Sequence, residues 1–364
     1  MSDLSEYRQV ARDLNVDAIA LVPGPNFIRA FRKPFMSHER PFLAVIPVSG
    51  PCAAIVPNLE LGSWALVDFD GPVFDWRDQT GYDEAFAALG AHMPLTSLAV
   101  EGQVMRVFVH HALKKAMPEL KIVDAEKEIS GLRIIKTEED IAAMQAAIDI
   151  SERALTRVLE GVRIGQTEKE VEQALIQALF AEGAEDQAFA PIVAAGDNSA
   201  RPHAKARPDY KIQSGDALLF DFGARKHGFA ADITRTVFVG DVSDEGRDVY
   251  DTVLRANKAG LAMTRDGVTA HDIDDTVIGV LEASPYADRI RTKTGHGLGR
   301  DVHEAPYIMR GNHQVMRAGM VYTNEPGLYE IGNFGVRIED DVLVTETGCI
   351  SLTSFPKDLM IVGR

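Results

Sequence analysis

Cysteine is almost absent from this chain of 364 residues, which contains only Cys52 and Cys349. Two cysteines this far apart form neither a CxxC pair nor the spacing of a disulfide framework. We therefore expect two reduced thiols, most of whose surface is buried.

The sequence also lacks long apolar runs and has fewer basic than acidic residues. No stretch approaches the roughly 20 apolar residues that span a bilayer, and the first residues lack the basic and apolar regions of a signal peptide. The 38 Lys and Arg residues against 54 Asp and Glu residues leave a net charge of -16, which disfavours binding to nucleic-acid phosphates. We expect a cytoplasmic protein with no membrane and no nucleic acid among its partners.

The composition is otherwise that of an ordinary folded protein, with 46% hydrophobic and 25% charged residues. The length allows two or three domains. Short apolar runs alternate with helical stretches in the first third, and we expect strands near 18–22, 42–46 and 53–56. This pattern predicts a small α/β domain, which ends near 129–136 where longer amphipathic helices begin.

The remainder of the chain repeats one order of elements. Thr137 and Thr167 each precede an acidic residue three positions on and then a helical apolar pattern, which predicts two capped helices. A β-rich stretch follows and ends in two strand-like runs. The same order of two helices, a β-rich stretch and a hairpin recurs, with Thr269 capping a helix in the second copy. We infer an internal structural duplication between 137 and 346.

Two aspartates mark the hairpin of the first copy. Asp221 and Asp232 lie in successive strand-like runs, and a symmetric hairpin through both is centred in the polar turn 225–228. This register predicts that the two carboxylates face each other. Facing residues of an antiparallel pair have Cβ atoms about 4.5 to 5.5 Å apart, where like charges repel.

Two glutamates repeat the arrangement in the second copy. A hairpin centred on Gly332 sets Glu325 opposite Glu339. Two acidic pairs, each symmetric about a plausible turn, are hard to explain as solvated strand faces. The pattern therefore indicates that positive charge lies among the four carboxylates.

Four carboxylates around one cavity cannot all ionise alone, because each negative charge raises the pKa of the next. They either share protons or bind a pair of metal ions. His296 favours metal, since it lies between glycines, where backbone and metal can approach closely. Carboxylate oxygens with one imidazole suit Mn²⁺, Fe²⁺, Co²⁺ or Zn²⁺. The glycine run 295–299 fits neither GxGxxG nor a Walker A sequence, so it does not indicate a phosphate loop.

The motifs around these residues are, in chain order, Ala217–Ala224, Ala231–Thr236, Gly295–Gly299, Val302–Pro306, Asn324–Tyr329 and Gly335–Asp340. Together they resemble the motifs of the pita-bread metallopeptidases, most closely those of the Xaa-Pro aminopeptidases and Xaa-Pro dipeptidases (prolidases). The resemblance implies an α+β fold. Residues 133–364 would form a pita-bread catalytic domain with a pseudo-twofold internal duplication, and residues 1–132 a smaller, creatinase-like α/β domain.

The resemblance also implies a metal site and a reaction. The five family ligands carry over to Asp221, Asp232, His296, Glu325 and Glu339, with Asp232 and Glu339 shared between two divalent ions. Similar enzymes most often use Mn²⁺ or Co²⁺, with Zn²⁺ also known, and Fe²⁺ fits the same ligands. A hydroxide bridging the metals would attack the carbonyl before a proline at the second position of a small peptide. The expected activity is hydrolysis of the bond between an N-terminal residue and proline.

Further roles follow from the same resemblance. Glu325 would shuttle a proton from the attacking water to the leaving nitrogen. His203 and His303 match two more histidines of the family site and would bind the substrate and stabilise the tetrahedral intermediate. Arg337 shares a strand face with Glu339 and would either hold a carboxylate ligand or meet a substrate carboxylate. Similar proteins are often homodimers, and we expect one here.

Three places depart from the family pattern and leave the choice of substrate open: the segment 26–33, Arg300 where leucine is commoner, and Asn324 where an apolar residue is usual. Extra positive charge near the pocket would favour an acidic or short substrate. Two alternatives to a peptidase remain. One is a small-molecule hydrolase or lyase of the same fold, similar to ectoine hydrolase or a dimethylsulfoniopropionate lyase. The other is a non-catalytic binding module, which the presence of all five ligands disfavours.

Overall fold

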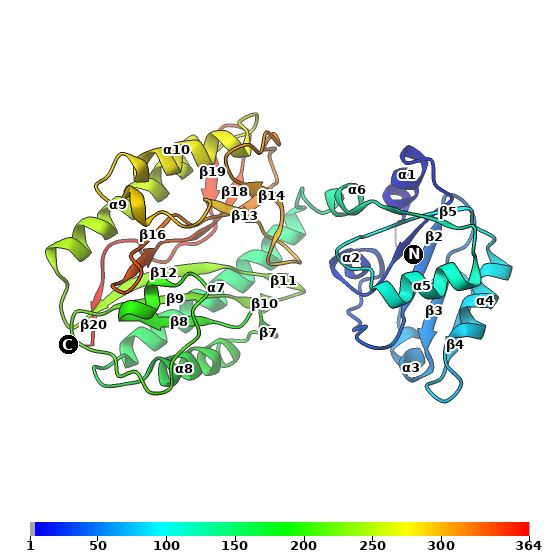
Figure 1. The fold of residues 1–364 in the computed structure, drawn as a ribbon, viewed down its shortest axis with the longest axis horizontal. Coiled ribbons are helices and arrows are strands. Elements are labelled where there is room, and N and C mark those ends of the chain that lie inside the picture. The colour runs from blue at the N-terminus through cyan, green and yellow to red at the C-terminus, as the bar shows by residue number, and fades with distance from the viewer. Residues whose placement is uncertain (1–3, 364) are drawn as a thin grey trace. The chain divides into compact units, whose positions relative to one another are not determined.

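The computed structural model describes residues 4–363, and the chain divides into two compact units, one up to Arg133 and one from Ile134 onward (Figure 1). Each unit has buried hydrophobic clusters of its own. No helix within residues 4–363 combines the length and apolarity that a membrane span requires.

A mixed six-stranded sheet forms the centre of the first unit, in the order β4-β3-β2-β1-β5-β6. The strands are β1 (Ala18–Leu21), β2 (Leu43–Pro47), β3 (Ala53–Pro57), β4 (Val73–Trp76), β5 (Ser97–Val100) and β6 (Lys121–Asp124). The predicted strands near 18–22, 42–46 and 53–56 are therefore confirmed as β1, β2 and β3. Their fully buried apolar runs made them recognisable, because such runs are typical of central strands.

Helices cover both faces of this sheet. They are α1 (Ser5–Asp13), α2 (Pro25–Phe31), α3 (Leu61–Trp64), α4 (Asp83–His92), α5 (Val107–Ala116) and α6 (Glu126–Gly131). Apolar side chains of α1, α2 and α6 share one cluster with Ile19 and Leu21, whereas α4 and α5 share the other with Ala18 and Ala20. Successive strand residues point to opposite faces, so this division is the alternation expected of a three-layer α/β domain.

The segment 26–33, a departure from the family pattern, packs one face into the core of the first unit. Most of it forms α2, where Phe27 is fully buried and its ring centroid lies 5.6 Å from that of Phe42. Asn26 is also buried and donates a hydrogen bond to Glu101 Oε1 at 2.7 Å. These contacts give the segment a structural role within its own unit.

Two helix pairs flank the strands of the second unit (Figure 1). They are α7 (Glu138–Gly161) with α8 (Glu168–Ala181), and α9 (Asp244–Met263) with α10 (Ala270–Glu282). The predicted capping boxes at Thr137, Thr167 and Thr269 are confirmed, since each threonine accepts a hydrogen bond from the backbone N–H three residues on. This bond satisfies an N–H group that a helix leaves unpaired.

Two larger sheets lie between the helix pairs, in the orders β20-β12-β9-β8 and β14-β13-β15-β18-β19. Their strands are β8 (Ile192–Ala195), β9 (Ala217–Phe222), β12 (Ile233–Val239), β13 (Gly295–Gly297), β14 (Glu304–Ile308), β15 (Val321–Asn324), β18 (Asp340–Val344), β19 (Cys349–Ser351) and β20 (Ile361–Val362). Short strands form two further sheets, in the orders β11-β10-β7 and β16-β17. These strands are β7 (Asp186–Gln187), β10 (Ala224–Lys226), β11 (Phe229–Ala230), β16 (Gly327–Tyr329) and β17 (Gly335–Arg337). A helix pair followed by a β-hairpin thus occurs twice, as the sequence predicts.

The first hairpin has a different register from the predicted one. Its turn is His227–Gly228, with φ of 51° and 75°, which fits the two-residue turns that strand twist favours. Lys226 therefore pairs with Phe229, and Asp221 pairs with Thr234 rather than with Asp232. Because side chains alternate, Asp232 still shares the face of Thr234 and is a diagonal neighbour of Asp221.

The second hairpin has the predicted register. Asn324 pairs with Asp340 on one side and Gly327 pairs with Arg337 on the other, so Glu325 and Glu339 stand across from each other between the two ladders. Gly332 adopts φ of 87° in the connecting turn. A positive φ of this size suits glycine, which has no Cβ to clash.

Candidate metal centre

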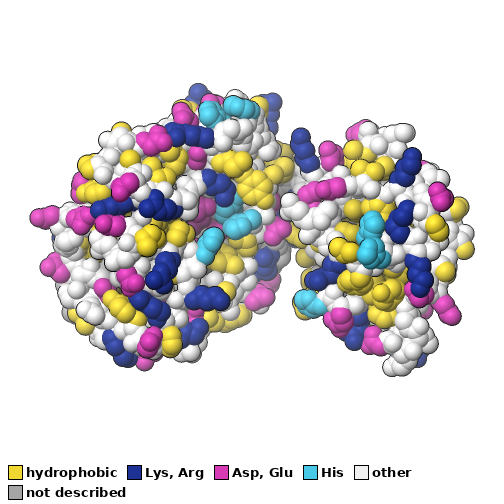
Figure 2. Space-filling model, viewed as in Figure 1, with side chains coloured by type: hydrophobic (Ala, Val, Ile, Leu, Met, Phe, Trp, Pro, Cys, Tyr) yellow, Lys and Arg dark blue, Asp and Glu magenta, His cyan; other side chains and the backbone are white. Residues whose placement is uncertain are grey.

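A cavity of about 680 Å³ opens where the two hairpins of the second unit meet. All eight residues that the sequence singled out line it: Asp221, Asp232, His296, Glu325, Glu339, His203, His303 and Arg337. In Figure 2, histidine side chains lie at a hollow on this face of the second unit, with acidic atoms deeper inside. The hollow is thus acidic at its base and carries imidazoles nearer to its mouth.

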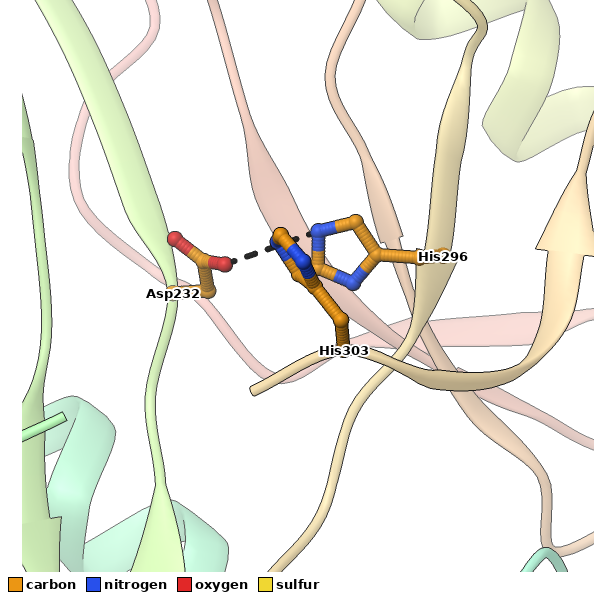
Figure 3. Close-up of side chains that lie close together, drawn as sticks. All are labelled: Asp232, His296 and His303. Atoms are coloured by element: carbon orange, nitrogen blue, oxygen red, sulfur yellow. Dashed lines mark ion pairs between the residues drawn. The ribbon is translucent and has the colours of Figure 1, made fainter. Parts of the chain in front are cut away.

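Ligand atoms in this cavity form three overlapping groups, each with atoms within 4.8 Å of one another. The groups are Asp221 with Asp232 and Glu339, His296 with Glu325 and Glu339, and Asp232 with His296 and His303. Figure 3 shows the Asp232 carboxylate pointing toward the two imidazole rings. Asp232, His296 and Glu339 each occur in two groups, so neighbouring candidate metal sites share ligands here.

His296 presents one ring nitrogen to the acids. Its Nε2 lies 3.3 Å from Glu325 Oε1 and 3.7 Å from Asp232 Oδ2, while its Nδ1 lies 3.1 Å from the Gly297 carbonyl oxygen. A proton on Nδ1, donated to that carbonyl, leaves the Nε2 lone pair directed at the carboxylates. Metal-binding histidines are commonly oriented in this way.

Burial changes the protonation of these groups. It raises the pKa of Asp232 and of Glu339 well above the usual range, and the neighbouring carboxylates raise both further. Burial also raises the pKa of Glu325 to about 7, although the positive charge of Arg337 opposes the shift. For His296, burial and the nearby His303 lower the pKa to about 3. The site therefore holds a neutral imidazole beside carboxylates that need positive charge to ionise.

Divalent cations fit this set of residues. Within residues 4–363, the buried oxygens Asp221 Oδ1 and Glu339 Oε1 have no hydrogen-bond partner, and a buried carboxylate oxygen without a partner is costly. A cation would satisfy both atoms and offset the repulsion among the acids. The donors are oxygens and imidazole nitrogens, with no thiol among them, a combination that suits Mn²⁺, Fe²⁺, Co²⁺ or Zn²⁺.

Two threonines that hydrogen-bond the candidate ligands were not predicted from the sequence. Thr234 Oγ1 donates to Glu339 Oε2 at 2.5 Å, and the Glu339 N–H donates to the Thr234 carbonyl at 3.1 Å. Thr323 Oγ1 donates to Glu325 Oε1 at 3.1 Å and accepts from the His296 N–H at the same distance. The only available signal was position, since Thr234 and Thr323 each lie two residues from a carboxylate and so share its strand face.

All three guanidinium nitrogens of Arg337 are engaged inside the protein. Nε donates to Thr234 Oγ1 at 2.9 Å, one terminal nitrogen donates to the Tyr329 hydroxyl at 2.8 Å, and the other pairs with Asp221. The side chain is only 3% exposed. Of the two roles that the sequence left open, this geometry favours holding the Asp221 carboxylate over meeting a substrate carboxylate.

The two other family departures lie outside the cavity lining. Arg300 stacks over the Phe229 ring, with its guanidinium carbon 4.1 Å from the ring centroid, and reaches Asp140 at 3.6 Å. Asn324 is fully buried and donates to the Asn257 carbonyl in α9 at 2.8 Å. Both residues therefore join elements of the second unit, and the Arg300 guanidinium lies against Phe229 and Asp140 rather than in the cavity lining.

Metal binding should stabilise the fold, and more strongly at higher pH. A carboxyl group with a raised pKa in the folded state stabilises the metal-free fold below its unfolded pKa and loses that contribution as pH rises through the folded value. For Glu325 this window runs from 4.5 to about 7. Chelator treatment should therefore lower the Tm, by a larger margin at about pH 7.5 than at about pH 5, in calorimetric scans.

Asp232→Asn serves as the control in these scans, because its Tm should respond little to added metal. A Tm difference between metal-loaded and chelated wild type that stays constant or shrinks with rising pH would contradict the account.

Sequence comparison matches residues 142–346 to metallopeptidase family M24 and residues 9–135 to the creatinase/prolidase N-terminal domain. An Xaa-Pro dipeptidase from Pyrococcus horikoshii is 32% identical over 349 residues, which cover 95% of each chain. Among solved structures, a prolidase from Thermococcus sibiricus has a TM-score of 0.94 at 33% identity, covering 99% of this chain and 98% of that one. An X-Pro aminopeptidase from Thermotoga maritima has a TM-score of 0.86 at 29% identity, covering 100% of both chains.

Proposed function

This chain belongs to metallopeptidase family M24 and is therefore a hydrolase, and from that premise we propose that it cleaves the peptide bond between an N-terminal residue and a following proline. The single observation that carries the proposal is the convergence of four carboxylates and an imidazole in one cavity of the second unit. The names of the similar proteins support proline at the second position.

Two divalent ions would be held by Asp221, Asp232, His296, Glu325 and Glu339, with Asp232 and Glu339 between them. Their grouping supports this assignment, since Asp232 and Glu339 both occur with the ligands of either side. Ions bound here would supply a nucleophilic water near neutral pH and polarise the scissile carbonyl. Manganese is the ion we propose for the cell, because it accepts an oxygen-rich set with one imidazole.

Glu325 would act as the proton carrier. It lines the cavity and Thr323 fixes its Oε1, so the carboxylate is positioned to take and return a proton. The proton would leave the attacking water and reach the nitrogen of the departing proline. Arg337 would keep Asp221 in place and add positive charge beside Glu325.

His203 and His303 would contact the substrate. Both side chains are exposed to the cavity, and the His303 ring centroid lies 4.0 Å from that of His296. Burial, and next the charge of Lys293, lower the pKa of His303, so a neutral imidazole with one N–H is the form available at neutral pH. Such an N–H can donate to the carbonyl oxygen as negative charge develops on it.

The mouth of the cavity supports a dipeptide as the preferred substrate. Lys293 lines the cavity, is exposed and forms no ion pair within residues 4–363; its Nζ lies 5.8 Å from the Tyr307 ring centroid. In an Xaa-Pro dipeptide the terminal carboxylate is only two bonds from the proline nitrogen, so a cation near the reaction centre can pair with it. A longer peptide or an amide lacks this charge at that position.

A substrate panel tests the function and this preference together. Protein stripped with chelator and reloaded with Mn²⁺ or Co²⁺ should cleave Xaa-Pro dipeptides faster than Xaa-Pro amides or Xaa-Pro-Yaa tripeptides. Lys293→Met should lower kcat/KM for dipeptides by about 10- to 100-fold, the value of a charge-assisted hydrogen bond, and change cleavage of the amides little.

Lys258→Met, at an exposed position of α9 outside the cavity lining, is the matched control and should behave as wild type. Equal losses on dipeptides and amides would contradict the role of Lys293. Turnover of small non-peptide amides alone would contradict the peptidase assignment.

The proposal includes a cytoplasmic location, a homodimer, and a domain division into residues 1–132 and 133–364. Both cysteines of the structure are free thiols, which supports a reducing compartment. All residues that we assign to the site lie within 133–364, which supports that segment as the catalytic domain.

A further inference from the structure

A buried ion pair lies at the residue that follows His303 in the chain. The ammonium group of Lys136 pairs with the carboxylate of Glu304, and each side chain is only 2% exposed. Lys136 Nζ also donates to the Ile134 carbonyl at 3.1 Å, and its backbone N–H donates to the Gly319 carbonyl at 2.8 Å. The pair therefore ties the start of the second unit to a segment 168 residues further along the chain.

Glu304 is the immediate neighbour of His303 and begins β14. His303 lies in the bend that precedes this strand. It is exposed and lines the cavity, whereas Glu304 is buried and does not line it. An interaction that fixes the Glu304 carboxylate therefore also restrains the adjoining backbone, which carries the His303 ring.

Two glycines of the run after His296 pack closely against this segment. A Cβ on Gly297 would lie 2.2 Å from the Ala305 carbonyl oxygen, and a Cβ on Gly299 would lie 2.9 Å from Glu304 Oε1. Gly297 also pairs with Glu304 at an irregularity of the β13–β14 ladder. The strand that carries His296 therefore packs closely against the segment that carries His303, next to the ion pair.

Stability alone does not account for two charges at this place. Bringing both ions out of water costs several kcal/mol, and replacing a buried ion pair with apolar residues is often neutral or stabilising. A charged hydrogen bond has a defined length and direction, however, which an apolar contact lacks. What a buried ion pair adds, compared with an apolar contact, is a fixed position for the atoms that it joins.

We propose that the Lys136–Glu304 pair is a positioning device for His303, which holds the ring beside His296 at the location where it meets the substrate carbonyl. The inference rests on the proposed function in one respect, since it requires that His303 contacts the substrate. Neither Lys136 nor Glu304 lines the cavity, so both act through His303.

Kinetics of variants of the pair test this proposal. Lys136→Met combined with Glu304→Met removes both charges, and Glu304→Gln removes one while retaining the shape of the side chain. Both should lower kcat on an Xaa-Pro dipeptide by about 10- to 100-fold, because small misplacements of a positioned group have effects of this size. The KM and the bound metal per chain should stay near their wild-type values.

A double-mutant cycle with His303→Ala separates positioning from a general structural effect. If the pair acts through His303, its loss should reduce kcat no further once His303 is absent. Leu179→Ala is the control: this buried α8 residue lies in a cluster away from the cavity lining, and its loss should lower the Tm and leave kcat unchanged.

Losses that add in full to that of His303→Ala, or wild-type kcat in both variants of the pair, would overturn the inference. An equal loss of kcat in Leu179→Ala would also overturn it, because destabilisation would then explain the effect. Wild-type protein that is loaded with metal but inactive on every Xaa-Pro peptide would instead refute the proposed function.

Discussion

Asp232→Asn is expected to lower kcat/KM for Xaa-Pro dipeptides by more than about 100-fold and to reduce the bound metal per chain. Changes to residues that merely support a metal ligand cost about 10- to 100-fold in affinity or activity, and loss of a shared ligand should exceed that. Asp232 is buried and lies in two of the three groups of ligand atoms. Asparagine keeps the shape but contributes no negative charge to hold a divalent ion.

Elemental analysis of the dialysed protein, together with kinetics at saturating Mn²⁺, checks this expectation. Asp216→Asn is a matched control, since Asp216 accepts hydrogen bonds from Tyr210 and from the Gln213 N–H and lies outside the cavity lining. It should keep full metal and full turnover. An Asp232→Asn protein with two metals per chain and wild-type turnover would contradict the assignment of Asp232 as a shared ligand.

Glu325→Gln should reduce kcat by about 10²- to 10⁴-fold, the usual contribution of a positioned general acid or base. The carboxylate of Glu325 can take and give a proton, whereas an amide does neither near neutral pH. Glu325 occurs in only one group of ligand atoms, so Gln should cost less bound metal than Asp232→Asn does.

Turnover of Glu325→Gln is therefore compared with wild type at equal metal occupancy. Glu172→Gln provides the control, because Glu172 is a buried glutamate whose partner is Lys169 in α8. At full metal loading, a Glu325→Gln kcat within about twofold of wild type would remove Glu325 from proton transfer and leave it only a role as ligand.

The second hairpin shows how far the sequence could specify the site. Gly332 lies midway between Glu325 and Glu339, and the ladders on both sides of these glutamates are in the register that this symmetry predicts. The turn glycine and the spacing of the two carboxylates predict the same register here. A strand pattern and one glycine were enough to place two carboxylates across from each other.

The first hairpin shows where such reasoning fails. Symmetry about the polar turn 225–228 set Asp221 opposite Asp232, but the turn consists of His227 and Gly228, which moves the register. The preference for a two-residue turn with positive φ at both positions decided the pairing. The carboxylates nonetheless converge, because a shift of two in the pairing keeps the same strand face.

Contacts across large sequence separations could not be predicted at all. Thr234 and Glu339 are 105 residues apart, and Lys136 and Glu304 are 168 apart. Threonine and lysine are ordinary surface residues by composition, and no local pattern marks their partners. Packing of the two hairpins brings Thr234 to Glu339. The start of the second unit packs against β14, which brings Lys136 to Glu304.

Anomalous diffraction from crystals grown with manganese tests the central claim most directly. The account predicts two peaks within one cavity, both bounded by Asp232 and Glu339, one next to Asp221 and the other next to His296 and Glu325. Peaks elsewhere on the protein, or none among these five side chains at saturating manganese, would contradict it.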